Sequence, residues 1–266
     1  MTTQKPTPAV YIVGSSGAGK STLAKALAER LGWRYVPLSA GAAYARHGVT
    51  FDQAEADPVL MQRIQTEICM DADHAIGGAL EAGTPFVTDR AIDYGVYTAL
   101  MCPVSPNARN AVMSIKLAMQ GDGAAVLFCR PVREIIHTAR QTDQNRAAEP
   151  GGKRSKFLKV GWVDRVDAGV TVLLRTLGIP FTEIGPGTRA ERLDRATAVV
   201  FERICGAAFK ELRADGWPLC PSCGEDELHN SPIWTGTVRP PLTDLISMGL
   251  ACYRCNWKFV PDKSAK

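Results

Sequence analysis

The stretch Gly14-Ser15-Ser16-Gly17-Ala18-Gly19-Lys20-Ser21 fits the pattern G-x-x-x-x-G-K-[ST] at every fixed position. Its context also fits, because the apolar run at residues 9–13 predicts a strand and residues 21–31 predict a helix. A strand, a glycine-rich loop and a helix in this order are typical of a phosphate-binding loop. The alternative is a Gly/Ser turn that binds no ligand. The predicted strand before it and helix after it argue against this alternative. The chain is therefore expected to bind a nucleoside triphosphate.

Each part of this loop has a physical task. Glycines let consecutive backbone N–H groups curl around a polyphosphate, and the following helix adds unpaired N–H donors and the positive end of its dipole. Lys20 is expected to reach the β- and γ-phosphates, and the Ser21 hydroxyl is expected to coordinate Mg²⁺. The residues expected to bind ATP are Gly14, Ser15, Ser16, Gly17, Ala18, Gly19, Lys20, Ser21 and Thr22.

Strands alternate with helices along most of the chain. Apolar spacing and the positions of Gly and Pro predict strands over residues 9–13, 33–38, 85–88, 124–129 and 180–184, and helices over residues 21–31, 59–81, 92–101, 162–177 and 189–214, with another helix ending at residue 119. This alternation indicates an α/β fold, a parallel sheet with helices on both faces. We expect this domain to span residues 1–215 and a small module to span residues 216–266.

The composition is that of an ordinary folded protein. Of the 266 residues, 45% are hydrophobic and 22% are charged, and the formal net charge is +4. No apolar run reaches the roughly 20 residues needed to span a bilayer, and no charged-then-apolar signal peptide is present. These observations argue against a membrane partner and predict a cytoplasmic location, which is the host cytoplasm if the chain is viral.

An acidic residue stands at the carboxyl end of the short strand predicted over residues 85–88. In a parallel sheet, Asp89 on a strand beside the first would face the Mg²⁺ and the transferring phosphoryl group. It can hold the metal's water shell or accept the proton of an attacking hydroxyl. The alternative is that Asp89 only caps the helix predicted from Ile92. Arg90 is expected to bind an acceptor phosphate or to pair with Asp93.

The phosphate loop, the Asp89-Arg90 pair and the arginine-bearing segment after residue 130 together resemble the P-loop nucleoside and nucleotide kinases. This group includes the thymidylate, cytidylate and nicotinamide-riboside kinases, and the resemblance covers about residues 9–185. It implies a kinase-type parallel sheet, ATP as the phosphate donor and Mg²⁺ as the cofactor.

A second stretch, Leu38-Ser39-Ala40-Gly41-Ala42-Ala43-Tyr44, is similar to the acceptor-site stretch L-D-T-G-A-M-Y-R of cytidylate kinases. By this resemblance the acceptor contacts are Ser39, Gly41 and Arg46, and Arg90 after the predicted strand is a further candidate. Two departures matter: Ser39 stands where the family has an acidic residue, and Arg46 comes one position later than the family's arginine. Both departures count against free cytidylate as the acceptor.

The window of residues 130–159 carries eight Lys or Arg side chains against three acidic ones. By the resemblance it corresponds to the kinase lid, in which Arg140 or Arg146 closes over ATP and neutralises charge on the phosphoryl oxygens. Arg133 and Arg140 are seven residues apart, which places them on one face of a helix. Two alternatives stay open: a solvated basic surface loop, and a surface that follows a nucleic-acid backbone.

The eight cysteines fall into two groups. Cys69, Cys102, Cys129 and Cys205 are scattered among apolar neighbours, as buried reduced thiols are. Cys220, Cys223, Cys252 and Cys255 form two C-x-x-C pairs with 28 residues between them. Each pair can turn two thiolates toward one ion, so these four residues predict a zinc ribbon with a structural Zn²⁺. A redox role or coincidence is the alternative.

Together these features predict an ATP- and Mg²⁺-dependent kinase for a nucleotide-type acceptor. The expected catalytic residues are Lys20, Asp89, Arg140 and Arg146, and the expected Mg²⁺ ligands are Ser21 and Asp89. The acceptor is either a free nucleoside or monophosphate, or a hydroxyl in DNA, as in phage kinases that phosphorylate 5-hydroxymethyluracil in DNA. The zinc ribbon, the off-pattern acceptor stretch and the basic window slightly favour DNA, which would contact the lid and the ribbon.

Two other functions remain as alternatives. In the first, ATP occupancy reshapes the ribbon for a protein or nucleic-acid partner and turnover is incidental. Residues 216–266 hold five acidic and five basic side chains, which is no electrostatic footprint for nucleic acid. In the second, the chain is a nucleic-acid-stimulated ATPase. The absence of a clear water-positioning glutamate after Asp89 counts against that ATPase.

Overall fold

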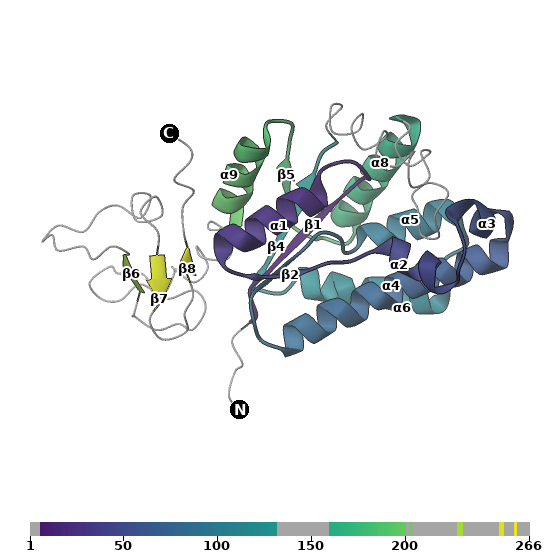
Figure 1. The fold of residues 1–266 in the computed structure, drawn as a ribbon, viewed down its shortest axis with the longest axis horizontal. Coiled ribbons are helices and arrows are strands. Elements are labelled where there is room, and N and C mark those ends of the chain that lie inside the picture. Colours follow the sequence, from purple (N-terminus) through teal and green to yellow (C-terminus); the bar gives the residue numbers. More distant parts are fainter. Residues whose placement is uncertain are drawn as a thin grey trace, which may run out of the picture.

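The computed structural model describes residues 6–131, 160–200 and 203, and the backbone of three short strands at residues 228–230, 250–252 and 258–259. Five strands form a sheet in the order β2-β3-β1-β4-β5 (Figure 1), and each neighbouring pair is parallel. Their bounds are β1 Ala9–Gly14, β2 Arg34–Val36, β3 Phe86–Thr88, β4 Ala124–Cys129 and β5 Thr182–Ile184. The predicted parallel sheet is confirmed, with a strand in each of the five predicted places.

The two longest strands lie next to each other inside the sheet. β1 and β4 pair along six residues, from Ala9↔Ala124 to Gly14↔Cys129, and all six residues of β1 are buried. Apolar runs buried on both faces are typical of parallel sheets. The edge strands β2 and β5 have three residues each, fewer than predicted. β2 ends before Pro37, whose missing N–H cannot continue the ladder.

Helices cover both faces of the sheet, as predicted. Their bounds are α1 Lys20–Leu31, α2 Ala40–Arg46, α3 Phe51–Ala56, α4 Pro58–Glu81, α5 Asp93–Met101, α6 Pro106–Met119, α8 Val160–Thr176 and α9 Arg189–Val200. Alternate side chains of β1 enter two separate cores, because successive residues of a strand point to opposite faces. Val10 and Ile12 join the core that α1 and α9 cover. Tyr11 and Val13 join the core that α4, α5, α6 and α8 cover (Figure 1).

Local signals explain where several helices begin and end. The Asp57 side chain accepts hydrogen bonds from the backbone N–H groups of Val59 and Leu60, and Pro58 occupies the first turn of α4. Gly32 ends α1 with a φ of 64°. The long helix predicted over residues 189–214 is confirmed as far as Val200, and most of its remainder lies outside the described residues.

Near the C-terminus, β6 Leu228–Asn230, β7 Leu250–Cys252 and β8 Lys258–Phe259 form an antiparallel sheet in the order β6-β7-β8. Three predicted zinc ligands, Cys220, Cys223 and Cys255, lie outside the described residues, and Cys252 is described only through the backbone of β7. The zinc ribbon and the domain boundary near residue 216 stay predictions. Within the described part of the chain, no helix combines the length and apolar character that crossing a membrane requires.

Candidate active site

The phosphate loop connects the carboxyl end of β1 to the first residue of α1. Gly14 has a φ of 141°, and both Gly17 and Gly19 have a φ of 76°. Residues that carry a Cβ atom rarely adopt these backbone angles. Gly14 is also pressed against β4, since a Cβ there would lie 2.5 Å from the carbonyl oxygen of Cys129. The loop therefore needs glycine for two reasons, its backbone conformation and the close approach of β4.

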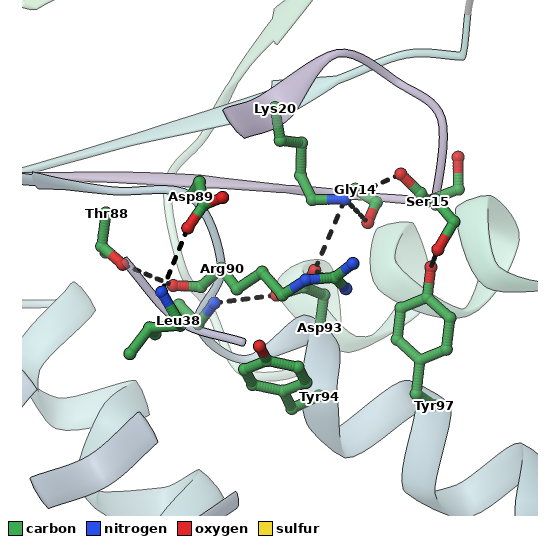
Figure 2. Close-up of polar contacts among 12 residues, drawn as sticks. Gly14, Ser15, Lys20, Leu38, Thr88, Asp89, Arg90, Asp93, Tyr94 and Tyr97 are labelled. Carbon is green, nitrogen blue, oxygen red and sulfur yellow. Dashed lines mark hydrogen bonds and ion pairs between the residues drawn. The ribbon is translucent and has the colours of Figure 1, made fainter. Parts of the chain in front are cut away.

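Lys20 folds back over this loop and is 5% exposed. Its Nζ donates to the carbonyl oxygens of Gly14 at 2.8 Å and Ser15 at 2.7 Å. The Oδ2 atom of Asp93 lies 4.0 Å from the same Nζ (Figure 2). The ammonium group thus lies beside the phosphate loop, where it contacts backbone carbonyls at the end of β1 and a carboxylate of α5.

Asp89 follows β3 directly, and β3 lies beside β1 as the sequence predicted. Its carboxylate is 4% exposed and accepts a hydrogen bond from the Leu38 backbone N–H, with 3.3 Å between Oδ1 and nitrogen. The carboxylate in Figure 2 is directed to Leu38, while the bond drawn from the Lys20 ammonium to a carboxylate goes to Asp93. The N-cap of α5 is Ile92, so the alternative that Asp89 caps this helix is wrong. Its catalytic role stays a prediction.

Asp93 was not singled out as a site residue in the sequence. It opens α5 and is completely buried, with Oδ1 accepting from the Ala91 N–H at 2.8 Å. Its Oδ2 lies 3.6 Å from Nη1 of Arg90, so the predicted pairing of these two residues is confirmed. Burial raises the pKa of the Asp93 carboxyl above its ordinary value, although Lys20 and Arg90 act in the opposite direction. Asp93 thereby links the loop lysine to the arginine that follows β3.

Two tyrosines enclose the Arg90 guanidinium. Its Cζ lies 5.2 Å from the ring centre of Tyr94 and 5.4 Å from that of Tyr97. The Tyr97 hydroxyl lies 3.0 Å from Oγ of Ser16 in the phosphate loop. Arg90 is therefore held beside the phosphate loop by contacts with both rings.

The predicted acceptor residues occupy the start and end of α2. Ser39 is its N-cap but makes no side-chain capping bond, and Gly41 lies in the first turn. Arg46, in the last turn, pairs with Asp71 at 2.6 Å and with Glu67 at 3.6 Å, both on α4. Arg46 is thus engaged with the helix that packs beside it. The acceptor role of all three stays a prediction.

The lid arginines Arg133, Arg140 and Arg146 lie outside the described residues. Arg130, at the start of the same basic window, is described. Its guanidinium pairs with Asp167 on α8 and, at 2.7 Å, with Glu183 on β5. Arg130 therefore ties the end of β4 to two neighbouring elements at the point where the basic window begins.

A cavity of about 620 Å³ opens beside the phosphate loop on the side of α1 and α9. Its wall consists of Gly19, Thr22, Leu23, Ala26, Pro186, Gly187, Thr188, Arg189, Arg192 and Leu193. This cavity was not predicted from the sequence. The available signal was the turn Pro186-Gly187-Thr188 after the last strand, since ligands of α/β sheets bind outside the carboxyl ends of strands.

The oxygen-bearing side chains at the loop suit Mg²⁺. Ser21 is exposed in the first turn of α1, and the carboxylates of Asp89 and Asp93 follow β3. Among the described residues, no three His, Cys, Asp or Glu side chains are grouped so that they could hold an ion. Mg²⁺ commonly uses one or two carboxylates together with substrate phosphates. The donor set therefore fits a metal that arrives with a nucleotide.

Comparisons with known proteins agree with a phosphate-loop fold. A family model described as AAA domain matches residues 9–192 of the chain. The chain is also similar to a cytidylate kinase from Stutzerimonas stutzeri (strain A1501), with 39% identity over 70 residues. That match covers 24% of this chain, and the chain spans only 30% of the length of that curated relative.

Solved structures are similar at lower identity. A deoxyadenosine kinase from M. mycoides with bound dCTP has 13% identity and a TM-score of 0.47, covering 71% of this chain and 97% of that chain. A shikimate kinase from Acinetobacter baumannii in complex with shikimate has 15% identity and a TM-score of 0.40, covering 73% of this chain and 93% of that chain.

Proposed function

The chain belongs to the AAA domain family, and from this premise we propose that it is an ATP- and Mg²⁺-dependent kinase with a nucleotide-type acceptor. One observation carries the proposal. The glycine-lined loop with Lys20 and the acidic residues that follow β3 meet at the same edge of the sheet. This arrangement puts a phosphate donor beside carboxylates that can orient and deprotonate an attacking hydroxyl.

The chain's own residues bind and orient the donor. Backbone N–H groups of the loop hold the phosphates, and Lys20 exchanges its bonds to the Gly14 and Ser15 carbonyls for bonds to phosphate oxygens. The cavity beside α1 holds the nucleoside part, against the apolar side chains of Leu23 and Leu193. Ser21 and Asp89 would hold Mg²⁺, which supplies charge neutralisation at the phosphates.

On the acceptor side, Asp89 accepts the proton of the attacking hydroxyl as general base. Arg90, positioned by Asp93 and two tyrosines, binds a phosphate of the acceptor. Lid arginines, Arg140 or Arg146, close over the γ-phosphate and exclude water. Ser39, Gly41 and Arg46 complete the acceptor contacts.

The acceptor is proposed to be a hydroxymethyl-pyrimidine hydroxyl in DNA. Support comes from the basic window, the departures in the stretch after β2 and the cysteine pairs of a zinc ribbon on residues 216–266. A free nucleoside or nucleoside monophosphate is the second candidate, favoured by the 39% identity with a cytidylate kinase over 70 residues. A protein that uses ATP only to switch a binding surface is the candidate from another class.

The test is transfer of label from γ-labelled ATP to four acceptors: nucleosides, nucleoside monophosphates, plain DNA and hydroxymethylated DNA. Label on hydroxymethylated DNA alone supports the DNA proposal, and label on a small nucleotide supports the second candidate. Free phosphate with every acceptor would contradict the kinase assignment. Lys20→Met, prepared identically, shows whether any label comes from a contaminating kinase, because this variant lacks the charge that contacts the transferred group.

A further inference from the structure

An arginine of α9 is buried in the wall of the cavity beside the phosphate loop. Arg192 is 3% exposed and lines this cavity together with Gly19 and Thr22, which belong to the loop and the start of α1. Its Nε and Nη2 atoms have no hydrogen-bond partner among the described residues. A positive group with two unused nitrogen donors therefore borders the place where we expect the nucleotide.

Among the described residues, the acidic groups next to Arg192 on α9 have other partners. On the same helix, Glu191 accepts a hydrogen bond from the Thr188 N–H at 2.7 Å, and Asp194 pairs with Arg30 of α1. The thiol of Cys129 lies near Arg192 at the end of β4. Burial raises the pKa of this thiol to about 11, although Arg192 and Lys20 act to lower it, so the thiol is neutral at neutral pH.

A buried guanidinium without an anionic partner is unfavourable, because an arginine stays charged and burial removes its hydration. Buried arginines are normally paired. An anion that arrives with a ligand would complete the pair, and the phosphates are the anionic groups of a nucleotide. Arginine is also the side chain best matched to phosphate oxygens.

We propose that Arg192 binds the α-phosphate of the nucleotide from the cavity side of the loop, an inference that rests on the proposed nucleotide site. Lys20 approaches the loop from the opposite side and is suited to the β- and γ-phosphates. The apolar part of the cavity, at Leu23, Ala26 and Leu193, receives the base. The α-phosphate then lies between base and loop, where Thr22 and Arg192 border the cavity.

Arg192→Met tests this role, because methionine keeps an unbranched side chain and removes the charge. Dissociation constants for Mg-ATP and for inorganic tripolyphosphate are measured by calorimetry on the full chain. We expect both constants to rise roughly 10- to 100-fold, the range for losing a hydrogen bond to a charged group. Without ligand, the variant should melt at or above the wild-type temperature, because an unpaired buried charge is gone.

Matched variants separate the possible results. Arg165→Met removes an exposed arginine of α8, on the other face of the sheet, and should leave both constants unchanged. Arg192→Lys keeps the charge, so it should melt near wild type and bind ATP more tightly than Arg192→Met. Equal ATP affinity of Arg192→Met and wild type would overturn the proposal. So would weaker ATP binding with unchanged tripolyphosphate binding, since the contact would then be to base or ribose.

A large loss of stability in Arg192→Met would by itself weaken ATP binding and has to be separated from loss of the contact. If Arg192→Met melts well below wild type, Arg192→Lys decides: ATP binding as weak as that of the methionine variant would overturn the α-phosphate contact. Label transfer by the wild type is measured in parallel. A wild type that binds ATP through Arg192 but transfers no label would contradict the kinase proposal and leave the Arg192 inference standing.

Discussion

The two sides of the phosphate loop differ in how their charged groups are satisfied. On the β3–α5 side, Asp93 lies within ion-pair distance of both Lys20 and Arg90. On the α1–α9 side, the cavity wall is largely apolar, and Arg192 keeps two nitrogens without a partner among the described residues. The charged groups of the first side are thus satisfied by one another. The second side is complete only with an anionic ligand.

Asp89→Asn acts on transfer and on the Mg²⁺ site, and it should give the largest effect. The amide cannot accept a proton from the attacking hydroxyl, so transfer of label should fall by roughly 10²–10⁴-fold. Affinity for ATP without Mg²⁺ should change little, because the loop and the cavity are untouched. Single-turnover transfer and ATP titration measure the two effects separately. Asp164→Asn, on the exposed surface of α8, is the matched control, and unchanged transfer in Asp89→Asn would show that Asp89 is misassigned.

Gly14→Ala breaks the loop that both sides share. The new Cβ would lie 2.5 Å from the Cys129 carbonyl oxygen, and the φ of 141° is itself unfavourable for alanine. Strain and overpacking together should lower the free energy of unfolding by roughly 2–5 kcal/mol, and ATP binding should be lost. Denaturant unfolding and ATP titration measure this.

Gly83→Ala separates these two causes. Its φ is 66°, but a Cβ there would meet nothing within 4 Å. Only the backbone conformation is penalised, by about 1–2 kcal/mol, and ATP affinity should match wild type. Equal losses of stability in the two variants would mean that the contact with β4 does not matter.

The phosphate loop could be predicted from the sequence because its pattern is local. Eight consecutive residues with a strand before and a helix after them specify the turn and predict its ligand. The order of the strands could not be derived from the sequence. The assignment of Asp89 assumed that its strand lies beside the first one, and the pairing of β3 with β1 agrees with that assumption. Alternating apolar runs and helix-stop residues likewise gave the α/β layers.

Asp93 and Arg192 could not be assigned because their roles depend on contacts far apart in the chain. Asp93 lies 4.0 Å from Lys20, which is 73 positions earlier, and no local pattern reports that distance. For Arg192 one signal existed. Arg192, Ala196 and Val200 share one buried face of α9, so a charge stands in an apolar stripe. A charge in an apolar stripe indicates that a partner or a ligand contacts it. The cavity beside Arg192 is visible only in the folded structure.

The stability of the β3–α5 side should depend on pH through the buried carboxyl of Asp93. Because burial raises the pKa of Asp93 above 3.8, its ordinary value, the folded chain binds this proton more tightly than the unfolded chain does. The resulting stability is present below the ordinary pKa and is lost as pH rises through the raised one. Asp93→Asn cannot lose a proton there. The melting temperature of this variant relative to wild type should therefore rise between pH 4 and neutral pH. A constant difference across this range would contradict the buried, raised carboxyl.

Substitutions in two capping boxes should have the smallest effect on stability, and one of them is a matched control for the other. Before α9, the Thr188 Oγ1 accepts from the Glu191 N–H at 3.3 Å and the Thr188 N–H donates to Glu191. Before α3, the Thr50 Oγ1 accepts from the Gln53 N–H at 3.3 Å, and the Thr50 N–H donates to Gln53 at 2.8 Å. Thr188→Ala and Thr50→Ala should each lower the free energy of unfolding by about 1 kcal/mol.

Their effects on ATP binding should differ, because only Thr188 lines the cavity and fixes the start of the helix that carries Arg192. α3 packs into the core on the other face of the sheet through Phe51 and Ala54. We therefore expect Thr188→Ala to weaken ATP binding severalfold and Thr50→Ala to leave it unchanged, both measured by calorimetry. If equal losses of stability came with equal losses of affinity, ATP binding would follow global stability, and the α1–α9 side would have no separate role in holding the nucleotide.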